Sequence, residues 1–353
     1  MPEHYKRTST MRLRDLAISV ASLAACLTVQ PGLAQDKVLN LYSARHYSTD
    51  EALYANFTKA TGIRINRIDA GDEQLLERLK TEGANSPADV LLLVDAARLW
   101  NAQQMGLYAP VKSALLEARI PADMRDRDGN WFGFSTRARV IVYNKVALKP
   151  GEVASYEALA DPKLKGKVCT RSGSHPYMLS LVAAVAEHDG EAKAEAWAKG
   201  MVANLARKPA GGDTDQIKAV ASGECAVALT NTYYWVRLLK STRPDEQEVV
   251  KKVGFLWPNQ ASYGTHVNIS GGAMLKNAPN KEAAVKFLEY LASDQAQAYF
   301  ADGNNEWPTV KSVTVKNAEL DSLGKFKMDN IGPAVFGKNT PMAQRIVDRA
   351  GWR

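Results

Sequence analysis

An extended stretch from Trp131 to Tyr143 constrains the fold of this chain more than any other feature. It reads WFGFSTRARVIVY and is rich in the aromatic and β-branched residues that favour strands. Patterns of strands and helices lie on both sides of it, but no helix interrupts it. A chain that crosses from one α/β lobe to another needs such a connection, and we place the crossing between Thr136 and Arg139. The sequence therefore predicts two lobes.

The first series of patterns begins with a short buried strand from Val38 to Tyr42, a polar turn and a helix from Glu51 to Ala60. An alternating strand from Ile63 to Ile68 comes next, and then a helix that Asp72 can cap. The strand from Ala88 to Val94 is apolar enough to be buried on both faces. This order of strands and helices is typical of an α/β lobe.

A second series follows the extended stretch and then returns to the first lobe. Its predicted elements are a strand at 167–170, helices at 177–187 and 191–205, a strand at 225–230, a return crossing at 262–270, a strand at 271–275 and a helix that Asn280 caps. We therefore expect one lobe from residues 35–136 and 264–312, and another from residues 137–263 and 313–353.

The first 34 residues have the pattern of a secretory signal peptide. Basic residues precede the apolar run LAISVASLAACLTV, and a small-residue cleavage site ends at Ala34. The segment Leu23-Ala-Ala-Cys26 offers an alternative, in which Cys26 would carry a lipid anchor, but the apolar run continues beyond that cysteine. We predict cleavage after Ala34 and export of the protein.

Composition narrows the possible partners of the mature chain. Its formal charge of +7 falls to +5 without the leader, and the excess forms no Lys/Arg block of the kind that follows a nucleic-acid backbone. Cys169 and Cys225 remain, without a CxxC spacing, so they form either one structural disulfide or two buried thiols. We expect no nucleic-acid partner.

Tyrosines gather where predicted strands end. Tyr233 and Tyr234 follow one strand of the second lobe, Tyr177 ends a polar loop after another, and His46-Tyr47 follows the first strand of the opposite lobe. Ligands of open α/β sheets bind beyond the carboxyl ends of the strands. Phenolate oxygen is hard and anionic, and a trivalent cation can displace the phenol proton although the ordinary pKa is about 10. The pattern indicates a ferric-iron site.

Each motif also has a structural explanation. The His-Tyr pair could form a helix-capping turn, and the doubled tyrosine could place one ring in the core and the other outside it. We expect His175, in the loop before Tyr177, to be a spare histidine unless that loop folds inward. We expect His266, at the return crossing, to be a hinge residue with a satisfied ring.

Enzyme motifs are weak or absent in the sequence. The segment from Gly332 to Asn339 imitates a phosphate-binding loop, but Asn339 replaces the Ser or Thr that would bind magnesium. Neither G-x-S-x-G nor H-E-x-x-H occurs. We expect a protein that is not an enzyme.

Several segments together resemble the tyrosine-rich periplasmic ferric-ion-binding proteins of bacterial iron ABC transporters, over nearly all of the mature chain. The segments are Arg45-His46-Tyr47, Ser172 to Tyr177, Asn231-Thr-Tyr-Tyr234, Ser86 to Val90 and Asn305-Glu-Trp-Pro308. The resemblance implies an α/β, two-lobed periplasmic-binding-protein fold of type II, similar to a transferrin lobe, with a hinged cleft. It implies as iron ligands Tyr47, Tyr177, Tyr233 and Tyr234, with His46 as a fifth in some members.

Charge separates two versions of this site. Four phenolates around Fe(III) leave one negative charge, which a nearby arginine would offset. If Tyr47 or His46 stays outside the shell, an anion such as carbonate or a citrate oxygen must complete it. Arg137 resembles the family's anion-contacting arginine, Arg139 or Arg45 could replace it, and a structural salt bridge would explain any of the three.

The implied function is capture of Fe(III) in the periplasm, by a monomer, and delivery to an inner-membrane ABC permease. An alternative within the same architecture is a binding protein for an organic solute or oxyanion such as a polyamine, thiamine or phosphonate. A secreted enzyme with His46 or His175 as a base is the alternative from another class.

Overall fold

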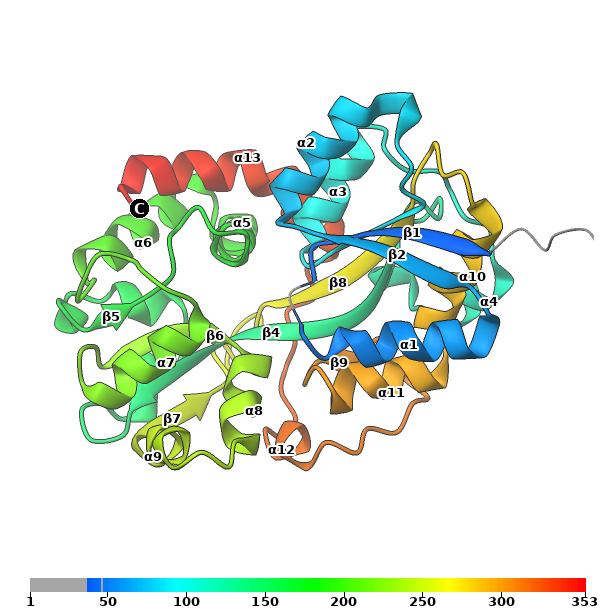
Figure 1. Ribbon diagram of the computed structural model, residues 1–353. Helices are drawn as coiled ribbons and strands as arrows, with labels where there is room; N and C mark the ends of the chain where they lie inside the picture. Colours follow the sequence, from blue (N-terminus) through cyan, green and yellow to red (C-terminus); the bar gives the residue numbers. More distant parts are fainter. Residues whose placement is uncertain (1–36, 46) are drawn as a thin grey trace, which may run out of the picture. The chain divides into compact units, whose positions relative to one another are not determined.

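The computed structural model describes residues 37–45 and 47–353. The predicted signal peptide, with Ala34 and Cys26, and the candidate ligand His46 lie outside the described residues. The main sheet has the order β2-β1-β3-β8-β4-β6-β5, and β7 and β9 each pair with β4 (Figure 1). The strands are β1 (Val38–Ser43), β2 (Arg64–Asp69), β3 (Val90–Leu93), β4 (Phe132–Asn144), β5 (Val168–Cys169), β6 (Val227–Asn231), β7 (Val253–Leu256), β8 (Val267–Met274) and β9 (Trp307–Pro308).

Strand β4 joins two lobes because its two halves have different partners. Residues from Phe132 to Ala138 pair with β8, whereas residues from Arg139 to Tyr143 pair with β6. The change of partner falls inside the predicted crossing. Strand β8 (Val267–Met274) runs without a break through the later part of the predicted return crossing and most of the strand predicted after it. We call the part around β1, β2, β3 and β8 the first lobe and the part around β5, β6 and β7 the second; the exact predicted lobe boundaries stay a prediction.

Helices of the first lobe pack on its sheet through aromatic side chains. Phe57 of α1 and Phe287 of α10 are fully buried, with ring centroids 5.0 Å apart. The helices are α1 (Asp50–Thr61), α2 (Asp72–Glu82), α3 (Ala96–Gln104), α4 (Ala114–Arg119), α10 (Lys281–Leu291) and α11 (Asp294–Asp302).

Two predicted helix caps of this lobe are wrong in detail. Helix α2 begins at Asp72 itself, and its capping residue is Gly71, whose N–H donates to the side chain of Gln74 over 3.2 Å. Asn280 stands at the capping position of α10, but its side-chain amide donates to Asp89 over 3.0 Å and does not cap the helix. At Asn280 the contact with Asp89 determines the role of the side chain.

The second lobe has a separate core between α5, α6 and the C-terminal helix, with Val182, Trp197 and Ile346 among its buried members. A disulfide joins Cys169 at the end of β5 to Cys225 before β6, which settles the choice that the sequence left open. The helices are α5 (Pro176–Asp189), α6 (Glu191–Ala203), α7 (Asp213–Ser222), α8 (Thr232–Lys240), α9 (Pro244–Lys252), α12 (Ala318–Asp321) and α13 (Pro333–Ala350).

Helix α13 contacts both lobes, since it packs on α5 and α6 and also on α3 (Figure 1). Its approach to α3 requires glycine, because a Cβ at Gly337 would lie 2.4 Å from the side chain of Trp100. In the described part of the chain, none of the helices combines the length and the apolar run that a bilayer crossing needs.

Candidate metal centre

The four candidate tyrosines all lie where a strand gives way to a helix. Tyr233 and Tyr234 stand in the first turn of α8, directly after β6, and Tyr177 stands in the first turn of α5. Tyr47 lies in the connection between β1 and α1, in the first lobe. The connections therefore bring these side chains to the facing ends of two lobes, as the sequence pattern predicted.

The structure brings the four tyrosines together. The hydroxyls of Tyr177 and Tyr233 lie 3.1 Å apart. The ring of Tyr47 packs edge-on against that of Tyr233 with centroids 5.5 Å apart, and the rings of Tyr233 and Tyr234 have centroids 4.3 Å apart. Tyr233 is fully buried and Tyr234 half-buried, so the doubled tyrosine does place one ring deeper than the other. Both nevertheless belong to the same cluster.

Burial favours the protonated phenol at three of these tyrosines by raising the pKa of each. It raises the pKa of Tyr177 above its ordinary value of 10, and the nearby Tyr234 adds to this effect. Burial likewise raises the pKa of Tyr47 and of Tyr233 well above 10, helped by Glu306 and by Tyr177 respectively. A ligand of high positive charge would therefore have to displace protons from the phenols in order to bind them.

Glu306 holds Tyr47 in place, a role that the sequence did not reveal. The Tyr47 hydroxyl donates to Glu306 Oε1 over 2.8 Å, and the Ser135 hydroxyl donates to Oε2 over 2.6 Å. Arg45 forms an ion pair with Asp50, Nε to Oδ2 at 2.6 Å, and approaches Glu306 to 3.8 Å. The segment Asn305 to Pro308 resembles the family, but the sequence does not show its contact with Tyr47, because a contact across 259 residues leaves no local pattern.

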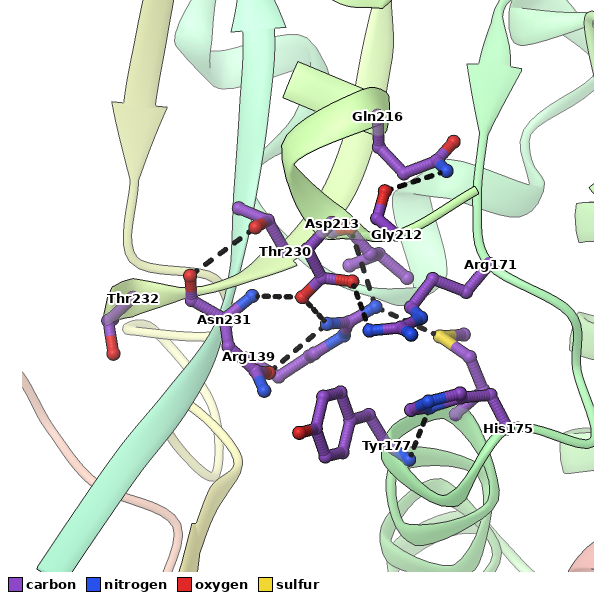
Figure 2. A network of polar contacts seen from close by, with 12 residues as sticks. Arg139, Arg171, His175, Tyr177, Gly212, Asp213, Gln216, Thr230, Asn231 and Thr232 are labelled. Atoms are coloured by element: carbon purple, nitrogen blue, oxygen red, sulfur yellow. Dashed lines mark hydrogen bonds and ion pairs between the residues drawn. The ribbon is translucent and has the colours of Figure 1, made fainter. Parts of the chain in front are cut away.

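A carboxylate of the second lobe, Asp213, organises a network of polar contacts near Tyr177 (Figure 2). Asp213 Oδ2 accepts from Arg139 Nη1 over 2.6 Å and from the backbone N–H of Asn231 over 2.7 Å. Arg171 Nη1 lies 3.5 Å from Oδ1 of the same carboxylate. Arg139 and Arg45 are thus engaged in buried ion pairs, which is the structural explanation that the sequence left open for them. Asp213 lies in no recognisable motif, so sequence reasoning missed it.

Arg137 differs from these arginines. Its side chain is buried, yet among the described residues neither Nη1 nor Nη2 has a hydrogen-bond partner. Its guanidinium carbon lies 5.6 Å from the Tyr177 ring centroid, and a cavity of about 10 Å³ opens beside both residues. Burial by itself lowers the pKa of Arg137, but the surrounding groups, with Glu306 and Tyr177 the strongest, together raise it. The tyrosine cluster therefore adjoins a permanent positive charge whose two Nη groups have no partner among residues 37–45 and 47–353.

Two histidines near the site, His175 and His266, contact other parts of the protein. His175 Nδ1 accepts from the backbone N–H of Tyr177 over 3.2 Å and so caps α5.

His266 is buried with its ring against Phe336, but its Nδ1 has no hydrogen-bond partner among the described residues. The expectation of a satisfied ring at His266 is therefore wrong. Burial, together with the charges of Arg137 and Arg139, lowers the His266 pKa to about 3, so the ring stays neutral.

Tyr177 and Tyr234 open onto a cleft of about 920 Å³, which the start of α2, the start of α5 and α13 also line. Within residues 37–45 and 47–353, no group of three or more His, Cys, Asp and Glu side chains could hold a metal ion. The tyrosine cluster offers phenol oxygens as donors at this end of the two lobes.

Comparison with known proteins agrees with this architecture. The family model "Bacterial extracellular solute-binding protein" matches residues 52–327. The chain is 51% identical over 323 residues to "Iron uptake protein A1" of Synechocystis, which covers 92% of this chain and 89% of that protein.

Solved structures are equally similar. A Trichodesmium structure, described as IdiA (FutA) in complex with iron and citrate ligands, has 52% identity and a TM-score of 0.84, and covers 90% of this chain and 100% of that one. The "Ferric binding protein from Campylobacter jejuni" has 41% identity and a TM-score of 0.86, and covers 89% of this chain and 100% of that one. This chain belongs to the bacterial extracellular solute-binding proteins, in the family of periplasmic ferric-ion-binding proteins.

Proposed function

We propose that this protein captures Fe(III) in the periplasm between its two lobes and delivers it to the inner-membrane permease of an ABC transporter. The observation that carries the proposal is the meeting of four tyrosines from both lobes at one place. They lie beside Arg137, whose Nη groups have no hydrogen-bond partner in the described part of the chain. The relatives with iron uptake and ferric binding in their names support it. The alternative of a polyamine, thiamine or phosphonate has no comparable support, because the relatives named above are iron uptake and ferric binding proteins. A cationic polyamine would in addition need carboxylates, and the buried carboxylates near the cleft already have partners within the protein.

The proposed ligands are the phenolate oxygens of Tyr47, Tyr177, Tyr233 and Tyr234. Tyr177 and Tyr233 already share a hydroxyl contact of 3.1 Å, so a small ion between them needs little movement of the rings. Tyr47 comes from the other lobe and would complete the shell when the lobes are closed. The proposal keeps His46 as a fifth ligand.

Charge supports a role for Arg137 in the same site. Four phenolates and Fe(III) carry one negative charge, and Arg137 places one positive charge beside Tyr177. With three phenolates, the unused Nη donors of Arg137 would instead bind an oxygen of an anion such as carbonate or citrate. The Trichodesmium structure holds both iron and citrate, which supports the second version.

Closure of the lobes follows from ligands that come from both of them. Rotation would occur about β4 and β8, near the predicted boundaries at 136/137 and 263/264, and metal bound by both lobes would favour the closed form. We propose that the protein acts as a monomer after removal of residues 1–34. We propose no catalytic step, because the relatives named above are uptake and binding proteins.

The test is a ferric titration of the metal-free mature protein, followed by visible absorption. We expect a charge-transfer band that saturates at one equivalent of iron. In Tyr233→Phe the band should weaken and the affinity should fall by more than the 10- to 100-fold that loss of a residue outside the ligand shell causes.

Tyr290→Phe is the matched control. It also removes a buried hydroxyl, which donates to the Leu53 carbonyl over 3.1 Å, but in the core of the first lobe. Unchanged iron binding in Tyr233→Phe would refute the assignment of that ligand, and a flat spectrum in the unmodified protein would refute the iron site itself.

A further inference from the structure

A buried carboxylate of the first lobe is bound by a serine of the second. Asp95 follows β3 and caps α3, and its Oδ1 accepts from the Ala97 N–H over 2.8 Å. The hydroxyl of Ser180, in α5, lies 3.0 Å from Oδ1 and 2.9 Å from Oδ2 of Asp95. Asn268, in β8, donates to Oδ2 over 2.8 Å. Both Asp95 and Ser180 are fully buried.

The serine lies on the same face of its helix as one of the proposed iron ligands. Tyr177 and Ser180 are three residues apart in α5, so their side chains point to neighbouring places. Tyr177 reaches the tyrosine cluster, and Ser180 reaches the first lobe. The contact to Asp95 thus ties α5, which carries Tyr177, directly to the lobe that carries Tyr47.

The contact is sensitive to the angle between the lobes. A hydroxyl-to-carboxylate hydrogen bond is lost when its oxygens separate beyond about 3.5 Å, so a small rotation about β4 and β8 would break it. A cavity of about 150 Å³ between α3, α5 and α13 reaches Asp95. Water entering there can replace the serine hydroxyl when the lobes part, so the contact can open and close reversibly.

We infer that Ser180 and Asp95 form a latch between the lobes, which positions Tyr177 against the first lobe and slows the release of bound iron. Ser180 is a positioning residue, because it acts through the helix that carries Tyr177 and does not itself contact the metal. The inference rests on the proposed function only for the identity of the metal ligands. The hydrogen bond across the lobes is an observation of its own.

The test compares iron release from the full mature protein and from Ser180→Ala, with an excess of citrate as the acceptor. A hydrogen bond to a buried carboxylate is strong enough that we expect release about tenfold faster or more in Ser180→Ala. Iron uptake should be no slower in Ser180→Ala, because the contact holds the closed lobes together and is not needed for iron to enter. A general loss of structure would slow uptake as well.

Two further variants sharpen the result. Ser113→Ala is the matched control, because the Ser113 hydroxyl also donates to a carboxylate, Glu289 Oε1 over 2.6 Å, but inside the first lobe. Ser180→Thr keeps a hydroxyl and should restore slow release. Release from Ser180→Ala at the rate of the unmodified protein, or equally fast release from Ser113→Ala, would overturn the latch.

Small-angle scattering of the metal-free protein separates this inference from the proposed function. Ser180→Ala should favour the open form and show a larger radius of gyration than the unmodified protein. This measurement requires no iron, so it tests the latch even if no ferric ion binds. An identical scattering curve for the two proteins would contradict the latch, whereas absence of the charge-transfer band would contradict only the iron site.

Discussion

Replacing Asp213 by Asn should destabilise the second lobe strongly. The carboxylate is fully buried and receives three donors: Arg139 at 2.6 Å, the Asn231 backbone N–H at 2.7 Å and Arg171 at 3.5 Å. Asparagine has nearly the same shape but no charge. Wherever its amide NH₂ faced a guanidinium, two hydrogen-bond donors would point at each other and no bond could form. The substitution therefore removes the charge that compensates Arg139 without creating space for water.

The size of the effect follows from the burial of the partner. The Arg139 side chain is only 1% exposed, so it cannot turn to solvent when its partner is lost. Removing one member of a buried ion pair typically costs 3–5 kcal/mol, against a total stability of about 5–15 kcal/mol. Asn231 precedes Tyr233 by two residues, so displacement of this strand end should also weaken ferric binding.

Guanidinium unfolding of the metal-free protein measures this loss. Asp245→Asn is the control, because Asp245 pairs with Arg243 at 2.8 Å while both side chains are more than half exposed. An exposed pair should contribute less than about 1 kcal/mol. Adding Arg139→Met to Asp213→Asn should recover part of the stability, since it removes the uncompensated charge. A loss below about 1 kcal/mol in Asp213→Asn would refute the reasoning.

Three further predictions follow from the site and its supports. Iron uptake should release about one proton for each phenolate formed, so the apparent affinity should fall with falling pH, and pH-stat titration measures the number. The pKa of His266 is near 3 in the folded protein and about 6.5 in the unfolded chain, so the ring contributes stability above pH 6.5 that is lost as the pH falls toward 3. His266→Asn should therefore reduce the dependence of the unfolding free energy on pH, which thermal unfolding at several pH values measures. Replacing Cys169 and Cys225 together by Ser should lower the free energy of unfolding by about 4 kcal/mol, because the bridge closes a loop of 56 residues, and an unchanged denaturation midpoint would contradict that estimate.

Local sequence patterns were sufficient for much of the architecture. The extended stretch ending at Tyr143 is a single strand whose partners change inside the predicted crossing, because uninterrupted β-forming residues are visible without knowledge of the fold. The sequence also predicted that three tyrosines follow strands, namely Tyr177, Tyr233 and Tyr234. This was possible because the order of strand, turn and helix determines which end of a sheet a residue reaches. Helix caps were less predictable, as Asp72 shows.

The contacts that support the site depended on tertiary structure alone. Glu306 meets Tyr47 across 259 residues, and Asp95 meets Ser180 across 85, from different lobes. Asp213 gathers Arg139 and Asn231, which are remote from it in sequence. No local period encodes such pairs, because the distance between their members is set by how strands cross and helices pack. The sequence by itself thus determined which chemical groups reach the cleft, and the packing of the two lobes decided which partners hold them there.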